Sequence, residues 1–294
     1  MLNNIKSPLL KLIFSYLKES EKLNIIINSK IFQKKLEVNF ETYKNFGNTY
    51  KIGERTGKGK EYLKYNNEIV FEGEYLNGRR NGKGKEYICE FLIFEGEFLN
   101  GKRNGNGKEY YDNGKIMFEG KYLKGERNGK GKEYYEDGNL KFEGNFLTGE
   151  RNGKGKEYYE DGNLKFEGNF LNGERNGKGK EYYENGNLKF EGEYLKGEKK
   201  KGKEYNENGK LKFEGEYLNG ERNGKGKEYH DNGKIMFEGK YLEGERNGKG
   251  KEYYVDGKLI FEGNFLNGER NGKGKEYYNG KLIYQGEYRN GERD

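Results

Sequence analysis

The feature of this sequence that most constrains its fold is an internal repeat of 23 or 24 residues. The triplet Phe-Glu-Gly begins at positions 71, 94, 118, 142, 166, 190, 213, 237 and 261, and a variant triplet begins at Tyr284. A second triplet, Lys-Glu-Tyr, lies between these and occurs ten times. A short unit copied along a chain predicts a stack in which each copy contacts its neighbours. Residues 47–294 are therefore predicted to form one repeat region.

Each unit has the pattern of two β-strands. In the copy at 140–166, apolar residues and Gly alternate with Lys, Glu and Asn, which is the period of a strand. Turns are expected at Gly149-Glu150 and at Asp161-Gly162, because Gly, Asn and Asp tolerate the backbone angles of tight hairpins. The predicted fold class is mainly β: an elongated single-layer antiparallel sheet of stacked β-hairpins, on the order of 95 Å long at about 4.8 Å per strand.

Folding the unit about these turns predicts a register in which large side chains face glycines across the ladder. The expected pairs are Phe146 with Gly153, Gly144 with Gly155, Leu140 with Tyr159, Glu143 with Lys156, Tyr159 with Leu164 and Glu157 with Phe166. The three shortened copies are expected to lose their residue at turns, near Cys89, near Lys200 and at Tyr278-Asn279.

One pair of neighbours leaves two arrangements open. Strict alternation places Glu157 on the face of Phe142 and Tyr158 on the charged face. A bulge near the Gly-Lys-Gly segment would reverse both assignments.

The first 46 residues differ in kind from the rest. Gly47 is the only glycine before position 50, and the apolar residues that follow Ser7-Pro8 have helical spacing. Residues 1–46 are therefore predicted to form a small α-helical module. The segment from Pro8 to Leu17 resembles the opening of an F-box, which would make Leu10, Ile13, Phe14 and Leu17 contacts for a ubiquitin-ligase adaptor. The alternative is a helical cap on the first hairpin.

The repeat itself resembles the MORN repeat. The copy at 213–226 reads aromatic-acid-Gly-acid-aromatic, then an Asn-Gly turn, then Gly-x-Gly. This chain has Tyr or Phe where that family usually has Trp, and Asn where it usually has His before Gly. The 24-residue spacing and the segment Tyr-Tyr-Glu-Asn-Gly at 182–186 are similar to the longer variant of the repeat. The resemblance implies a single-layer sheet used as a scaffold, a partner-binding surface or a membrane-proximal spacer.

The residue inventory argues against catalysis. His230 is the single histidine and stands where other copies carry Tyr, and no Ser follows Ser29. With one His and no Ser after position 29, these residues do not supply a catalytic nucleophile paired with a general base. Cys89 has no second Cys or nearby His for a metal. We therefore predict a non-enzymatic protein without a cofactor.

Net charge bears on the kind of partner. The total is +7, of which residues 1–50 carry +4, so the repeat region is nearly neutral. Binding of nucleic acid, which needs clustered and unopposed Lys and Arg, is not expected. Association with anionic membrane is the weaker of the remaining hypotheses. A single cysteine fits a reducing, cytoplasmic compartment.

Repeated Tyr and Arg residues are the candidates for a protein-binding surface. The Tyr of Lys-Glu-Tyr either packs against its neighbours along the sheet or forms, with nearby Lys and Arg, a surface for a partner. The candidate residues are Tyr134, Tyr158, Tyr182, Arg151 and Arg175. The leading hypothesis is a scaffold that binds a protein. The alternatives are a substrate receptor of a ubiquitin ligase and a peripheral membrane protein.

Overall fold

The computed structural model describes residues 49–64 and 66–294, which contain strands and turns but no helix. The chain divides into two compact units, Met1–Leu92 and Ile93–Asp294. The helical module predicted for residues 1–46, with Leu10, Ile13, Phe14 and Leu17, lies outside the described residues. That part of the prediction therefore stays a prediction.

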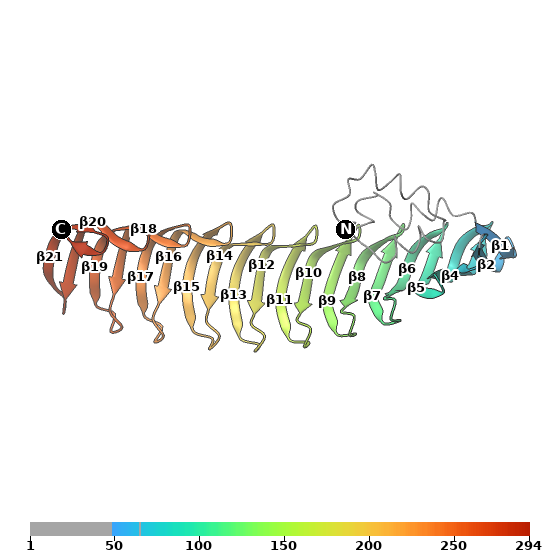
Figure 1. The fold of residues 1–294 in the computed structure, drawn as a ribbon, viewed down its shortest axis with the longest axis horizontal. Coiled ribbons are helices and arrows are strands. Elements are labelled where there is room, and N and C mark those ends of the chain that lie inside the picture. The colour runs from blue at the N-terminus through green and yellow to red at the C-terminus, as the bar shows by residue number, and fades with distance from the viewer. Residues whose placement is uncertain (1–48, 65) are drawn as a thin grey trace, which may run out of the picture. The chain divides into compact units, whose positions relative to one another are not determined.

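The described part of the first unit is a sheet of four strands (Figure 1). These are β1 (Thr49–Gly53), β2 (Gly57–Leu63), β3 (Ile69–Leu76) and β4 (Arg79–Ile88). Each pairs antiparallel with the next along the chain.

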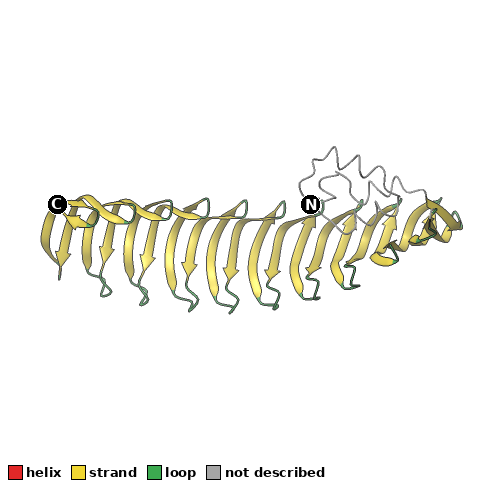
Figure 2. Ribbon diagram, viewed as in Figure 1, coloured by secondary structure: helices red, strands yellow, loops and turns green. Residues whose placement is uncertain are grey.

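The second unit contains the repeats from β5 (Phe91–Leu99), whose first residues lie at the unit boundary. Its strands also pair antiparallel in chain order, and Figure 2 shows them joined by short loops. The remaining strands are β6 (Lys102–Tyr110), β7 (Ile116–Leu123), β8 (Glu126–Tyr134), β9 (Leu140–Leu147), β10 (Glu150–Tyr158), β11 (Leu164–Leu171), β12 (Glu174–Tyr182), β13 (Leu188–Leu195), β14 (Glu198–Tyr205), β15 (Leu211–Leu218), β16 (Glu221–Tyr229), β17 (Ile235–Leu242), β18 (Glu245–Tyr253), β19 (Leu259–Leu266), β20 (Glu269–Tyr278), β21 (Lys281–Arg289) and β22 (Glu292–Arg293). The predicted open antiparallel sheet of hairpins is confirmed.

The middle of the predicted register is correct. Gly144 lies opposite Gly155, Glu143 opposite Lys156, and Glu157 opposite Phe142. On its other side Glu157 lies opposite Phe166.

The ends of the predicted register are wrong, because each copy contains two irregularities. The first turn is centred on Thr148 and Gly149, which both have positive φ, so Arg151 rather than Gly153 lies opposite Phe146. A bulge between Arg151 and Gly155 restores the pairing of the two glycines.

A second bulge lies between Glu157 and Tyr158, so Tyr158 rather than Tyr159 lies opposite Leu164. Neither bulge exchanges the faces of the two neighbours. Glu157 contacts Arg151 on the face of Phe142, whereas Tyr158 contacts Glu143 on the other face.

Two of the shortened copies lose their residue at a turn, as expected. Asn279-Gly280 and Cys89-Glu90 are two-residue turns with positive φ. The third expectation is wrong, since the residue missing near Lys200 is taken from a strand. In β14 the bulge opposite Glu193 and Tyr194 is one residue smaller, and Lys199 lies opposite Tyr194 where other copies have Arg.

The core is a ladder of aromatic rings along one face of the sheet. In each repeat the first Phe is fully buried, as for Phe142, and packs edge-to-face against Phe146 and against Phe170 of the next repeat at centroid distances of 5.4 and 5.2 Å. The glycine pair makes room for this ring. A Cβ on Gly155 would lie 2.4 Å from Cζ of Phe142. The glycines therefore let the phenyl ring lie flat on the backbone and fill the space between neighbouring hairpins.

Candidate functional site

The two faces of the sheet have different chemistry. We call the side that carries Phe142, Phe146, Arg151 and Glu157 the aromatic face, and the opposite side the lysine face. Because side chains alternate along a strand, the same assignment recurs at the equivalent positions of other copies. The two faces are considered in turn as candidate binding surfaces.

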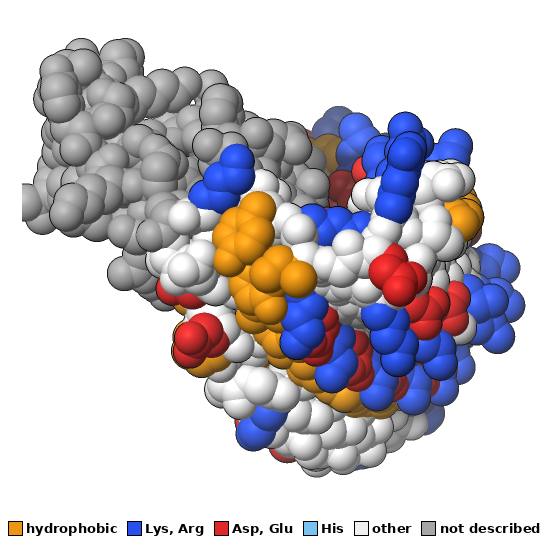
Figure 3. Space-filling model, turned by 90° about the vertical axis from the view of Figure 1, so that its right-hand side faces the viewer, with side chains coloured by type: hydrophobic (Ala, Val, Ile, Leu, Met, Phe, Trp, Pro, Cys, Tyr) orange, Lys and Arg blue, Asp and Glu red, His pale blue; other side chains and the backbone are white. Residues whose placement is uncertain are grey.

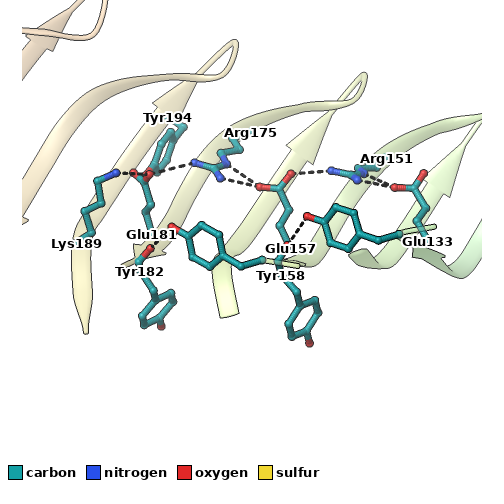
Figure 4. A network of polar contacts seen from close by, with 11 residues as sticks. Glu133, Arg151, Glu157, Tyr158, Arg175, Glu181, Tyr182, Lys189 and Tyr194 are labelled. Atoms are coloured by element: carbon teal, nitrogen blue, oxygen red, sulfur yellow. Dashed lines mark hydrogen bonds and ion pairs between the residues drawn. The ribbon is translucent and has the colours of Figure 1, made fainter. Parts of the chain in front are cut away.

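Ion pairs link successive repeats along the aromatic face (Figure 4), except at β14, where Lys199 replaces the Arg and lies over the ring of Phe190. Arg151 bonds Glu157 within its own repeat at 2.7 Å and Glu133 of the preceding repeat at 2.5 Å. Arg175 repeats the arrangement, with Glu157 at 2.7 Å. The side chain of Arg151 is 17% exposed, and its Cζ lies 4.2 Å above the centroid of the Phe142 ring. The guanidinium groups thus close the aromatic core and link one repeat to the next.

The predicted binding residues Tyr134, Tyr158 and Tyr182 lie on the other side. Their hydroxyls donate to the carboxylates of Glu119, Glu143 and Glu167 at 2.6, 2.8 and 2.8 Å. Figure 4 shows Tyr158 and Tyr182 pointing away from the arginine–glutamate chain. The structure therefore does not bring the predicted Tyr and Arg residues together into one surface.

Partial burial and the hydrogen bonds of these tyrosines within the sheet raise the pKa values of their hydroxyls. Partial burial, and then the hydrogen bond to Glu143, raise the pKa of Tyr158 to about 12. The same two causes raise the pKa of Tyr182 to about 12 and also raise the pKa of Tyr134. Each hydroxyl stays protonated and holds a carboxylate in place, as expected if the Tyr column packs along the sheet.

Beside the tyrosines runs a row in which Glu and Lys alternate, the lysine–glutamate row. Lys156 lies opposite Glu143 on one side and Glu167 on the other. Farther along, Lys251 and Lys275 lie 3.8 and 3.7 Å from carboxylate oxygens of Glu262. From Lys108 to Lys251 each Lys of this row has a Glu on either side, so this part of the row carries little net charge. At the end of the row, Lys275 has Gln285 on one side.

The next row on the same face is basic. Its members come from the Lys between the two glycines of Asn-Gly-Lys-Gly and from the residue after Phe-Glu-Gly, which is Lys, Asn or Glu. Two stretches of this row contain Lys and Asn but no carboxylate, one over β6–β12 and one over β16–β20. We call the second, which consists of Lys225, Lys240, Lys249, Asn264 and Lys273, the lysine row. Lys225 and Lys240 lie directly opposite each other. Within the part of the chain that the structure describes, no carboxylate lies within 4.0 Å of these ammonium groups.

A groove runs along the lysine face over β15–β21. It has a volume of about 1150 Å³, backbone at Gly226, Gly250 and Gly274, and both rows of charged side chains in its lining. Seen from the end of the sheet that carries β1, Figure 3 shows Lys and Arg side chains interleaved with Asp and Glu in a band beside hydrophobic side chains.

An apolar edge accompanies the lysine row. The last Leu of each Phe-Glu-Gly strand alternates onto the lysine face next to the turn, and its side chain is about half exposed in every copy of the second unit. Beside the groove these residues are Leu218, Leu242 and Leu266, at 58%, 50% and 49% exposure.

Sequence reasoning missed the lysine row and the leucine edge. It weighed Tyr and Arg as binding residues and treated the lysines as balanced by Glu. The available signal was the register, because the two lysines of Gly-Lys-Gly-Lys share a face but lie opposite different residues. Lys156 faces Glu143 and Glu167, whereas Lys154 faces Asn169.

The structure describes the surroundings of the single histidine and the single cysteine. Nε2 of His230 lies 2.9 Å from the carbonyl oxygen of Tyr253. At the equivalent position of another copy, the hydroxyl of Tyr159 donates to the carbonyl oxygen of Tyr182, so His230 takes the place of a structural Tyr. Burial, followed by nearby Glu68 and Glu90, raises the pKa of the Cys89 thiol, which disfavours the nucleophilic thiolate. Residues 49–64 and 66–294 contain no cluster of three or more metal-ligating side chains. They also contain no helix able to cross a bilayer.

Comparison with known families identifies the repeats. The MORN repeat matches residues 71–89, 94–116, 166–188, 213–235, 237–258, 261–281 and 284–294. The MORN repeat variant matches residues 127–147, 151–172 and 200–219. Together these matches cover most of the chain from residue 71 onward. No curated protein sequence matches the chain.

Solved structures show partial similarity. A crystal structure of TarM is 12% identical with a TM-score of 0.25, over 47% of this chain and 24% of that one. A mutant of S. aureus TarM in complex with Fondaparinux, alpha-GlcNAc-glycerol and UDP is 12% identical with a TM-score of 0.23, over 54% and 27%. A TcdB2–TccC3–Cdc42 structure is 11% identical with a TM-score of 0.17, over 76% and 16%. The chain thus spans no more than 27% of the length of these three.

Proposed function

Because this chain belongs to the MORN-repeat family, we propose that it is a non-enzymatic scaffold that binds a protein partner through its sheet. The observation that carries the proposal is the contrast between the two faces. On the aromatic face, Arg151 and its equivalents already make ion pairs with Glu and stack on Phe rings within the sheet. On the lysine face, charged side chains and glycine backbone line an open groove with exposed leucines beside it, and the ammonium groups of the lysine row have no carboxylate within 4.0 Å among the described residues.

The arrangement suits binding better than turnover. A groove whose floor is glycine backbone brings an incoming chain close to a rigid, hydrogen-bonded surface. Leucine side chains beside ammonium groups supply apolar contact area together with charge, the combination found in protein interfaces. Repetition of the same side chains suits an extended partner rather than one reacting group.

Site-specific photo-crosslinking tests this proposal. A photoreactive amino acid replaces Asn264 on the lysine face or, in a matched control, Asp256 in an exposed turn of the same unit. In cells, the variant at Asn264 should give discrete crosslinked protein bands that the turn variant does not give. Equal labelling at both positions, or no protein adduct at Asn264, would contradict binding through the sheet.

The ubiquitin-ligase hypothesis concerns residues outside the described part of the chain, and it stays a second proposal. Substituting Leu10→Lys together with Phe14→Lys should abolish capture of adaptor and cullin subunits while leaving the circular dichroism of the repeats unchanged. If adaptor subunits are absent from the unsubstituted protein as well, residues 1–46 do not serve as an F-box.

A further inference from the structure

We propose that the groove over β16–β20 binds an extended acidic polypeptide segment with a carboxylate at about every third residue. This inference rests on the proposed scaffold function and names the chemistry of the partner. It follows from the charge of the groove, the spacing of that charge and the apolar side chains beside it.

The charge of the groove is not neutralised from within. The carboxylates of Glu214, Glu238 and Glu262 already accept hydrogen bonds from Tyr229, Tyr253 and Tyr277, at 3.2, 2.6 and 2.9 Å. Two of these carboxylates also lie within 4.0 Å of a Lys of the lysine–glutamate row. Lys225, Lys240, Lys249 and Lys273 are exposed and carry no such pairing in the described residues. Seven lysines and four glutamates line the groove, and one of these glutamates, Glu287, lies directly opposite Lys273. The lining therefore keeps an excess of three positive charges for an anionic ligand.

The spacing of these charges selects an extended chain. Equivalent positions in successive repeats are separated by two strands, or about 9.6 Å. Three residues of a polyproline II segment span about 9.3 Å, and three residues of a β-strand about 9.9 Å. Two turns of an α-helix span about 10.8 Å, so a helix drifts out of register faster. An extended partner keeps one carboxylate beside the lysine row in each repeat.

The apolar edge defines what lies between the carboxylates. Leu242 and Leu266 follow Lys240 and Asn264 by two residues and therefore lie on the same face, and their side chains are 50% and 49% exposed. An apolar side chain between two acidic residues of the partner would cover part of these leucines. Charge then sets the register and apolar contact adds affinity.

The row also sets the length of the segment. Glu216 precedes Lys225 in the row and Glu287 follows Lys273, so a carboxylate stands at each end of the basic stretch. Five strands span about 19 Å between the first and the last, which corresponds to roughly six extended residues. A core motif of this length should account for most of the binding.

A peptide titration with the full chain tests the proposal. The probe is a labelled peptide of about twelve residues that repeats Glu-Pro-Leu, and the control peptide has the same composition with its Glu residues clustered at one end. The repeating peptide should bind one site, more tightly than the clustered isomer, with an affinity that falls steeply as salt rises. Equal affinities for the two isomers would overturn the spacing argument.

Two lysine variants locate the site. In the groove variant Lys225, Lys240, Lys249 and Lys273 are replaced by Gln. In the matched variant Lys121, Lys130, Lys154 and Lys178, which occupy equivalent positions over β7–β12 outside the groove, are replaced by Gln. The groove variant should weaken binding at least tenfold and the matched variant less than twofold. Equal weakening would mean diffuse attraction to positive charge and would overturn the proposal.

Further comparisons separate this proposal from the scaffold function itself. If the peptide does not bind but Asn264 still crosslinks to protein in cells, the acidic segment is wrong and the scaffold proposal stands. If vesicles containing phosphatidylserine bind in place of the peptide, and the groove variant abolishes that binding, the ligand is a membrane and the inference fails.

Discussion

At the scale of single residues, the glycine pair of each repeat does more than permit a turn. Gly144 and Gly155 face each other in the middle of the ladder, and the ring of Phe142 occupies the space that their side chains would fill. Folding the sequence about Gly149-Glu150 predicted this pairing correctly, although the turn lies one residue earlier and a bulge restores the register. It did not predict that the ring lying over both glycines belongs to their own hairpin, since that depends on the rotamer of Phe142.

Replacing Gly155 by Ala should destabilise the repeat by about 1–3 kcal/mol, because the added methyl group would lie 2.4 Å from Cζ of Phe142. Urea unfolding monitored by circular dichroism gives the change in the free energy of unfolding. Combining Gly155→Ala with Phe142→Leu should make the glycine substitution less costly than it is alone. If the glycine substitution costs the same in both backgrounds, the steric explanation is wrong.

Arg151 was predicted to lie on a binding surface, yet it has a structural role. Arg151→Met should cost about 2–3 kcal/mol, because the carboxylates of Glu133 and Glu157 lose charged hydrogen-bond donors in a half-buried setting. Lys156→Met, on the exposed face, should change stability by less than about 0.5 kcal/mol. Denaturant midpoints of the two variants provide the comparison, and equal losses would contradict the structural role.

The tyrosine column predicts a loss of stability in alkali. An ordinary Tyr in the unfolded chain titrates near pH 10, whereas Tyr158 and Tyr182 have a raised pKa of about 12. A raised folded-state pKa contributes stability that is fully present below about pH 10 and is lost as the pH rises towards about 12.

The measurement is the free energy of unfolding in urea at several pH values from about 8 to 11. Substituting both residues by Phe should make the decline between about pH 10 and 11 shallower than in the unsubstituted protein. Identical slopes would show that other groups, such as lysines, account for the alkaline loss.

At the scale of elements, the hairpins were easier to predict than their irregularities. Alternation in segments such as 140–147 identified the strands, and the Gly-containing pairs identified both turns to within a residue. A bulge near the Gly-Lys-Gly segment was one of two arrangements that the sequence left open, because the strand pattern continues through Asn152 and Lys154 without a break. The structure has a bulge there, between Arg151 and Gly155, but the bulge does not exchange the faces of Glu157 and Tyr158. Its position depends on Arg151 reaching the ring of Phe142, which is a contact made in three dimensions.

The first turn of the hairpin offers a matched pair of substitutions. Thr148 has a φ of 48° and Asn172, at the same position of the next copy, has a φ of 51°. A β-branched residue is strained there, whereas Asn is tolerated. Thr148→Asn should therefore stabilise the protein by about 1 kcal/mol, and Asn172→Thr should destabilise it by a similar amount. Thermal unfolding of both variants tests this, and a shift in the same direction for both would contradict the explanation.

At the scale of the whole molecule, a sheet built from local contacts should tolerate the loss of a complete copy. Removing residues 151–174 joins Glu150 to Arg175 and keeps the sequence in phase. The second unit should stay folded and become shorter by about 9.6 Å, because each repeat mainly contacts its neighbours. Small-angle scattering measures the change in length. Removing only residues 151–162 should instead reduce the content of strand, and an intact sheet in that variant would contradict nearest-neighbour stacking.

The repeats came directly from the sequence, whereas the lysine row did not, and the division at residue 47 stays a prediction. The lysine row is assembled from residues that are distant in sequence, such as Lys225 and Lys240, and it becomes visible once the register is known. A composition close to neutral concealed it, because the glutamates that balance the count lie in the neighbouring row and at other positions of the same row.

The smaller bulge of β14 bears on how the gene for this protein can change. Loss of a single codon within a strand would normally turn every following side chain to the wrong side. In β14 the missing residue is taken from the bulge, so Gly202 still lies opposite Gly192 and Glu204 opposite Phe190. Each copy of the bulge is thus a position where an in-frame deletion need not disturb the hairpins that follow. Natural variation in the length of such genes should therefore concentrate at these bulges and at the turns.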